Sequence, residues 1–105
     1  MIYFHGNGGS LANRFKRLAI FAASPNLSVI ALSYPGYPGS DGRASEANLY
    51  QAADQVIAYA KTLGFKESQM IFFGESLGTA IAIEMATRFA PKLVVLEAPI
   101  TSLLN

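Results

Sequence analysis

A serine lies between two glycines in the stretch 74–78, which reads GESLG. A serine in this G-x-S-x-G pattern can act as a nucleophile when the pattern follows a strand and opens a helix, because the turn between them is strained and exposes the hydroxyl. Residues 70–73 (MIFF) precede the pattern, and an apolar helical pattern follows it. A Cβ at Gly74 or Gly78 would collide with neighbouring backbone in such a turn. The spacing therefore predicts that Ser76 is a nucleophile in acyl transfer.

Acyl transfer also needs N–H donors for the oxyanion that forms on the attacked carbonyl. The backbone N–H of Leu77 is one candidate, because it lies at a helix N-terminus, where negative charge is stabilised. The second donor has to come from a loop without bulky side chains that faces the nucleophile. The stretch 5–9 (HGNGG) follows an apolar run and contains Gly6 and Gly8. We expect the backbone N–H of Asn7 in this loop to be the second donor.

Each of the two motifs has an alternative interpretation. Ser76 could simply cap the following helix, since serine is a favoured N-cap residue. The glycine-rich loop 5–9 could bind a nucleotide phosphate at a helix N-terminus. The dinucleotide pattern G-x-G-x-x-G, however, requires glycine at position 11, which is Leu11 here. The acidic ribose ligand expected after the next strand is also absent, because that strand ends at residues 33–34 (SY).

His5 is the only histidine of the sequence. It is therefore the only residue of the chain that could serve as a histidine base for Ser76. Its place on the glycine-rich loop favours a role in organising that loop through hydrogen bonds. No cysteine or acidic cluster accompanies it, so the sequence predicts no metal site.

Four short apolar runs predict strands that would position these residues. The runs are residues 1–4 (MIYF), 28–33 (SVIALS), 69–73 (QMIFF) and 93–97 (LVVLE). They are continuously apolar rather than alternating, which is typical of parallel strands covered on both faces.

A first helix is expected after Ser10, a candidate N-cap. Apolar residues at spacings of three and four predict its buried face: Leu11, Phe15, Leu18 and Ala22. The basic residues of this segment, such as Arg14 and Arg17, are expected on its surface.

A second helix is expected from Glu46 to Leu63, with Ser45 as its N-cap and Gly64 at its end. A third helix is expected from Leu77 to about Phe89. It is apolar nearly all round, which predicts burial on all sides.

Alternation of strands and helices predicts an α/β fold with parallel strands joined by crossover helices. The stretch 34–42 (YPGYPGSDG) is rich in proline and glycine and predicts a loop. It leaves the end of the second strand, where open α/β sheets place their ligand crevices.

The composition excludes several classes of protein. The chain has 105 residues, of which 51% are hydrophobic and 14% charged, and its net charge is +1. No basic stripe suited to nucleic acid is present. No apolar run approaches the ~18 residues that a membrane span requires. With no signal peptide visible, a cytoplasmic location is the default expectation.

The sequence resembles the α/β-hydrolase superfamily, and within it the serine aminopeptidase-like and monoacylglycerol lipase-like branch. The resemblance spans nearly the whole chain. The stretches that carry it are HGNGG at 5–9, SYPGYPGSDG at 33–42, GESLG at 74–78 and LEAPITS at 96–102. It implies that this region is a partial fold, corresponding to the third through sixth strands of the family with their three helices.

The resemblance also implies a function. Members of the superfamily hydrolyse small-molecule esters, thioesters or amides through an acyl-enzyme, without a cofactor. The resemblance implies that Ser76 is the nucleophile and that Asn7 and Leu77 are the oxyanion donors. Family members place their acid and histidine after later strands, and this chain has no histidine after Ser76. The catalytic triad is therefore expected to be incomplete in these 105 residues.

Acidic residues within the chain fit other roles. Some relatives carry the acid after the sixth strand, which makes Glu97 a remote candidate. A strand-end residue that bonds to nearby backbone is the simpler interpretation of Glu97. Asp41 and Asp54 fit a turn residue and a solvated helix residue.

An incomplete fold has structural consequences. The chain is expected to form one partial core domain over residues 1–105, without the N-terminal strands and the C-terminal acid and histidine region. Its sheet would have two unpaired edges, which invite pairing with other chains. The chain alone is thus expected to be inactive or nearly so. The alternative function is a non-catalytic remnant or module that binds a partner through these edges.

Overall fold

The computed structural model describes residues 1–6, 11–32 and 46–97 of the chain. Strands and helices alternate along it. In chain order they are β1 (Ile2–Phe4), α1 (Leu11–Ala22), β2 (Ile30–Leu32), α2 (Glu46–Thr62), the short 3₁₀ helix η1 (Glu67–Gln69), β3 (Ile71–Glu75), α3 (Leu77–Arg88) and β4 (Leu93–Glu97).

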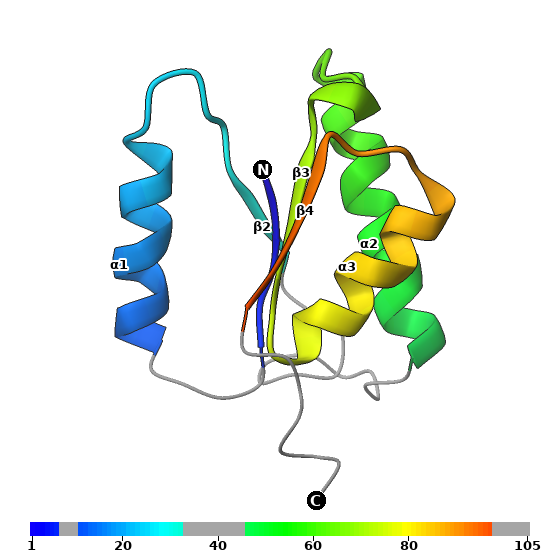
Figure 1. The fold of residues 1–105 in the computed structure, drawn as a ribbon, viewed down its shortest axis with the longest axis horizontal. Coiled ribbons are helices and arrows are strands. Elements are labelled where there is room, and N and C mark those ends of the chain that lie inside the picture. The colour runs from blue at the N-terminus through cyan, green and yellow to red at the C-terminus, as the bar shows by residue number, and fades with distance from the viewer. Residues whose placement is uncertain (7–10, 33–45, 98–105) are drawn as a thin grey trace, which may run out of the picture.

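The four strands form one sheet in the order β2-β1-β3-β4, and every neighbouring pair is parallel. Figure 1 shows α1 on one face of this sheet, with α2 and α3 together on the other. The expected fold, a parallel sheet with three helices, is therefore confirmed. All four strands point their carboxyl ends to one edge, which brings the segments after β1 and β3 together.

The predicted elements match the observed ones within two residues at each end. The strand expected at 69–73 is displaced to Ile71–Glu75, and that expected at 28–33 is shortened to Ile30–Leu32. The second helix ends as predicted at Gly64, whose φ is +100°. The N–H of Gly64 bonds to the Lys61 carbonyl and that of Phe65 to the Ala60 carbonyl, the pair of bonds of a Schellman motif. The expected caps Ser10 and Ser45 lie outside the described residues.

The hydrophobic core lies between the sheet and the helices α2 and α3. Its buried members are Ile2, Phe4, Leu49, Ala53, Ile57, Ala60, Met70, Phe72, Ile81, Ala82 and Met85. The central strands β1 and β3 are buried along most of their length, as expected for strands covered on both faces. The outer strands β2 and β4 are only half-buried, since within residues 1–6, 11–32 and 46–97 each has a neighbouring strand on one side alone.

Two predictions of burial are wrong. The third helix, α3, was expected to be buried on all sides, yet Ile83 is 50% exposed, because α3 covers the sheet with one face only. The apolar face expected for α1 is not its contact face, since Phe15 is 60% exposed and Ala22 is exposed. Instead α1 directs Arg14, Arg17 and Phe21 toward the sheet, where they meet partners from β1, β3 and β4.

Candidate active site

Ser76 lies at the junction between β3 and α3, at the carboxyl edge of the sheet. Its backbone has φ 53° and ψ −113°, in the left-handed half of the φ range that L-residues rarely adopt. Such a conformation persists only where the surroundings impose it. Its hydroxyl makes no capping hydrogen bond to α3, so the interpretation of Ser76 as a simple helix cap is not supported.

Close backbone packing imposes this turn. A Cβ on Gly74 would lie 2.4 Å from the carbonyl oxygen of Gly78, and a Cβ on Gly78 would lie 1.9 Å from that of Phe4. Real Cβ atoms do not approach so closely, so only glycine fits at either position. The collision predicted from the motif is therefore confirmed, and it also joins the start of α3 to the end of β1.

Hydrogen bonds hold the backbone of Ser76 on both sides. Its N–H donates to the carbonyl of Glu97 at the end of β4, with 3.0 Å between nitrogen and oxygen. Its carbonyl accepts both the N–H of Thr79 at 2.9 Å and the Thr79 hydroxyl at 2.7 Å. Thr79 is buried, and sequence reasoning overlooked it. Its position three residues after Ser76, where a threonine hydroxyl can reach a preceding carbonyl, was the available signal.

The glycine-rich loop begins directly against Ser76. A Cβ on Gly6 would lie 2.8 Å from the Cβ of Ser76 and 2.8 Å from the carbonyl oxygen of Glu75. The structure thus brings the start of the loop 5–9 to the serine turn. The two other residues predicted in that loop, Asn7 and Gly8, lie outside the described residues.

The remaining predicted donor, Leu77, is the first residue of α3. In this first turn the N–H of Thr79 is taken up by the Ser76 carbonyl. The N–H of Leu77 lies at the end of the helix where negative charge is generally stabilised.

His5 is half-buried at the end of β1, and its Nδ1 lies 2.7 Å from the carbonyl oxygen of Gly6. A carbonyl only accepts hydrogen bonds, so Nδ1 carries the proton and donates it. Burial lowers the pKa of His5, assisted by the positive charge of Arg14; the Gly6 hydrogen bond and the Glu75 charge act in the opposite direction. The ring is therefore neutral at pH 7 and is held to its own loop.

Ion pairs surround Glu75, the residue before the serine. Its Oε1 lies 3.4 Å from Nη2 of Arg14 and its Oε2 lies 3.6 Å from Nη1 of Arg17. The Tyr3 hydroxyl also donates to Oε2. Burial alone would raise the pKa of Glu75, but the Tyr3 hydroxyl, the charge of Arg14 and the Gly6 N–H together lower it. Glu75 is accordingly an anion at neutral pH.

This cluster corrects the sequence analysis. Arg14 was expected on the helix surface, yet its side chain is only 16% exposed. Arg17 pairs with the carboxylate of Glu97. Glu97, a remote candidate for the catalytic acid, thus has its side chain engaged by Arg17 while its carbonyl holds Ser76. Sequence reasoning missed the pairing because 61 residues separate Arg14 from Glu75 and 80 separate Arg17 from Glu97.

Other acidic residues lie away from the site. Asp54 on α2 pairs with Arg88 at the end of α3, with 2.6 Å between its Oδ2 and Nη1 of Arg88. It is therefore not simply solvated as expected. Asp41 falls in the loop 34–42, outside the described residues. In the part of the chain that the structure describes, no group of three or more His, Cys, Asp or Glu side chains could hold a metal ion. No helix among those residues is long and apolar enough to cross a bilayer.

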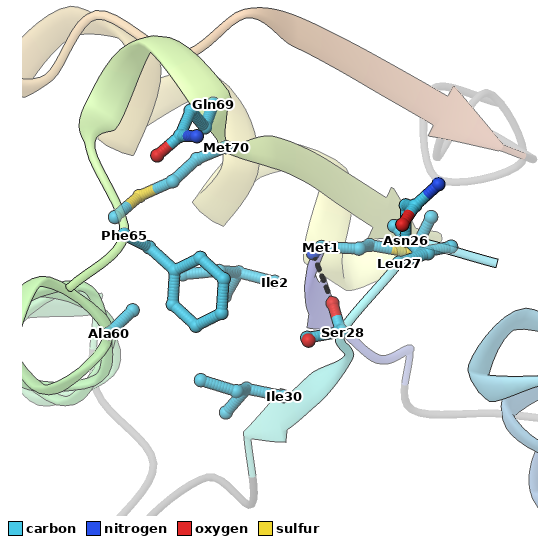
Figure 2. Close-up of a pocket in the computed structure, with 10 residues that line it drawn as sticks. All are labelled: Met1, Ile2, Asn26, Leu27, Ser28, Ile30, Ala60, Phe65, Gln69 and Met70. Atoms are coloured by element: carbon cyan, nitrogen blue, oxygen red, sulfur yellow. Dashed lines mark hydrogen bonds between the residues drawn. The ribbon is translucent and has the colours of Figure 1, made fainter. Parts of the chain in front are cut away.

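A cavity of about 130 Å³ lies at the opposite edge of the sheet (Figure 2). Residues at the starts of three strands line it, among them Ile2, Ile30 and Met70, together with Phe65 after α2. Because it opens at the amino ends of the strands, it is separated from Ser76 by the length of β3. It is not a binding site for a substrate of Ser76.

Comparison with known proteins gives consistent results. The sequence model of a family described as the alpha/beta hydrolase fold matches residues 1–98. Alpha/beta hydrolase domain-containing protein 17B of Xenopus laevis is 30% identical over 103 residues, and its human counterpart is 27% identical over the same length. Uncharacterized protein Rv2307c of Mycobacterium tuberculosis is 38% identical over 102 residues. No solved structure gives a significant match.

The lengths of these relatives differ from that of the chain. The matches cover 97% of the chain for the Xenopus protein and 94% for the mycobacterial one. They cover 36% and 35% of the relatives themselves. The chain therefore spans about a third of the length of the curated relatives it matches.

Proposed function

The chain belongs to the alpha/beta hydrolase fold family, and we propose that it carries the nucleophile of a serine hydrolase, Ser76. The substrate in this proposal is a small-molecule ester, thioester or amide. The observation that carries it is the left-handed backbone of Ser76, φ 53°, at the junction of β3 and α3. A conformation of this kind costs ~1–3 kcal/mol and is concentrated at functional sites. A serine that only ended a strand would have no need of it.

The proposed reaction has two steps through an acyl-enzyme. The Oγ of Ser76 attacks the acyl carbon while a base takes the hydroxyl proton. The bond to the leaving oxygen, sulfur or nitrogen then breaks, and the leaving group takes that proton from the base. Water next attacks the acyl carbon, gives its proton to the base, and releases the acid as the proton returns to Ser76. The N–H groups of Leu77 and Asn7 hold the oxyanion in both steps.

The proposal requires a base, because a serine hydroxyl without one is a poor nucleophile. His5 is the only histidine of the chain, and its Nδ1 donates to the Gly6 carbonyl. We assign His5 a role in organising the loop rather than in proton transfer. The base and its acid are assigned to residues other than these 105. On its own, the chain is then expected to retain only the small residual catalysis of a triad-deficient enzyme.

Labelling with a fluorophosphonate probe tests the proposal, since the probe reacts with activated serines. The protein that contains this chain, at its natural length, is expected to label on one serine of the chain, and Ser76→Ala to abolish that labelling. Ser68→Ala is the matched control, because Ser68 is exposed on η1. The isolated 105 residues are expected to react at least ~10³-fold more slowly.

Three outcomes contradict the proposal. The first is a natural-length protein, shown by circular dichroism to be folded, that does not label. The second is labelling that survives in Ser76→Ala. The third is rapid labelling of the isolated chain; it would leave Ser76 as the nucleophile, contradict the assignment of the base to residues other than these 105, and return His5 to that role.

A second candidate function is a module that binds a partner by adding a strand to the sheet. The supporting observation is that β4 is an outer strand of the sheet that the described residues form, with Leu93 51% and Leu96 41% exposed. Unpaired edges with apolar side chains favour pairing with another chain. Light scattering of wild type and of Leu96→Lys tests it: a larger particle that becomes monomeric in the variant supports it, and a monomeric wild type contradicts it.

A further inference from the structure

We propose that Glu75 and Arg14 are positioning residues that together orient Gly6 relative to Ser76. This inference deepens the proposed function, since the loop that starts at Gly6 is the one assigned to the second oxyanion donor. It concerns groups that do not touch the reacting atoms. Glu75 and Arg14 would act through the backbone of Gly6.

The two side chains lie next to both polar groups of Gly6. The N–H of Gly6 helps to lower the pKa of the Glu75 carboxyl, and a Cβ on Gly6 would lie 3.4 Å from Oε1 of Glu75. Nη2 of Arg14 donates to the carbonyl oxygen of Gly6 at 3.2 Å and to Oε1 of Glu75 at 3.4 Å. The three groups therefore form a ring in which one guanidinium nitrogen of Arg14 joins the carbonyl of Gly6 to the carboxylate of Glu75. His5 adds a further donor, Nδ1, to the same carbonyl.

Planarity of the peptide group turns this ring into an orienting device. The C=O of one residue and the N–H of the next lie in one plane and point in opposite directions. Fixing the carbonyl of Gly6 with Arg14 and His5 consequently fixes the plane of the peptide group at the start of the glycine-rich loop. That loop is the one to which we assign the second oxyanion donor. Glycine alone would leave the plane free to turn, since it lacks the steric restriction of a Cβ.

The surroundings favour a strong and directional contact. The side chains of Arg14 and Glu75 are only 16% and 18% exposed, so solvent screens their attraction weakly. Hydrogen bonds with an ionised partner are stronger than those between neutral groups. The groups that face Glu75 are Tyr3 from β1, His5 after it, and Arg14 and Arg17 from α1. Arg17 also contacts Glu97 on β4.

The contact requires Glu75 and Ser76 to be neighbours in the chain. Because the turn at Ser76 is fixed by Thr79 and by the Glu97 carbonyl, the carboxylate of Glu75 is a fixed point next to the nucleophile. The position of Gly6 is thus set relative to the same turn that presents the Ser76 hydroxyl. This arrangement gives the first variable position of G-x-S-x-G a role of its own in this protein.

The first experiment observes the Gly6 amide directly and does not depend on activity. Protein labelled with ¹³C-carbonyl histidine and ¹⁵N-glycine marks His–Gly peptide bonds, and His5–Gly6 is the only such pair in these 105 residues. We expect the Gly6 amide proton to shift upfield on acidification, with a midpoint below the ~4.3 of an ordinary glutamate. In Glu75→Gln this titration should disappear. A Gly6 amide that does not titrate overturns the inference.

The second experiment measures turnover, or the fluorophosphonate labelling rate, in the natural-length protein. Glu75→Gln and Arg14→Met are each expected to lower kcat by ~10- to 100-fold with KM nearly unchanged, because a misplaced donor weakens only the transition state. The double variant should be no slower than either single variant, and Arg14→Lys should recover part of the rate. The matched control is Glu84→Gln, whose carboxylate pairs with Arg88 on the outside of α3.

The outcomes separate this inference from the proposed function. If wild type labels on Ser76 and Glu75→Gln is equally fast, Glu75 does not position the loop and the inference fails while the proposed function stands. If wild type does not label, the proposed function fails, and the Gly6 titration still decides whether the ring exists. If Glu75→Gln does not fold, the titration in wild type and the rate of Arg14→Lys decide it.

Discussion

The two faces of the sheet are covered by different chemistry. On the face of α2 and α3, apolar side chains such as Ile57, Phe72 and Met85 are completely buried. On the face of α1, the helix reaches the sheet with two arginines and with Phe21, whose ring lies 5.6 Å from that of Phe73. The first face is a hydrophobic core, and the second is a polar and aromatic contact that converges on the serine turn.

The difference shows that one face of the sheet mainly stabilises the fold, while the other mainly positions residues around Ser76. Burial of apolar surface is strong but not directional, so it holds layers together without setting the orientation of a single peptide. Charge-assisted hydrogen bonds are directional and require particular partners. The α1 face therefore suits the fine placement of residues around Ser76, and the α2–α3 face suits the support of the whole sheet (Figure 1).

The largest effect is expected from truncating a side chain in the core. Met85→Ala should lower the free energy of unfolding by ~3 kcal/mol, because it removes buried methylenes and leaves a cavity. The measurement is urea denaturation followed by circular dichroism. Ile83→Ala is the matched control on the same helix, since Ile83 is half exposed and its truncation should cost much less. Equal losses in the two variants would mean that α3 has no inward face.

A smaller, pH-dependent effect is expected on the α1 face. The pKa of Glu75 is lowered in the folded protein, so this group stabilises the fold above its unfolded pKa of ~4.3. That stabilisation is lost as the pH falls through the lower, folded pKa. The stability difference between wild type and Glu75→Gln should therefore shrink between pH 5 and ~3. Comparing the variants cancels most of the contribution of His5, whose lowered pKa costs stability from pH ~6.5 downward.

Denaturation curves of both proteins at several pH values provide the measurement. A difference that stays constant to pH ~3 would show that the carboxylate is not stabilised by its neighbours.

The smallest effect is expected on the outer side of α1. Phe15→Ser should change the free energy of unfolding by less than ~0.5 kcal/mol, because Phe15 is exposed. Urea denaturation is again the measurement. A loss above ~2 kcal/mol would mean that Phe15 is buried in the folded protein and that the predicted apolar face of α1 is its contact face after all.

The order of elements and the serine turn follow from local sequence. Apolar runs of four to six residues, helical spacing between them and glycine at position 64 were sufficient to place the four strands and three α-helices found in the described residues, but not the short η1. The glycines around Ser76 predicted a turn crowded by backbone, and the distances at Gly74 and Gly78 confirm it. These features are readable because their causes lie within a few residues of one another.

Contacts between distant residues were decided by the tertiary structure alone. Helical spacing selected Phe15 for the inner face of α1, but Arg14 and Arg17 lie there, because their carboxylate partners come from β3 and β4. Nothing in the sequence of α1 indicates those partners, since a basic residue fits a solvent-exposed position on a helix equally well. By itself, then, the sequence determined the parallel fold and the strained serine; only the assembled sheet determined which charges meet beside it, because ion pairing depends on distance in space and not on spacing along the chain.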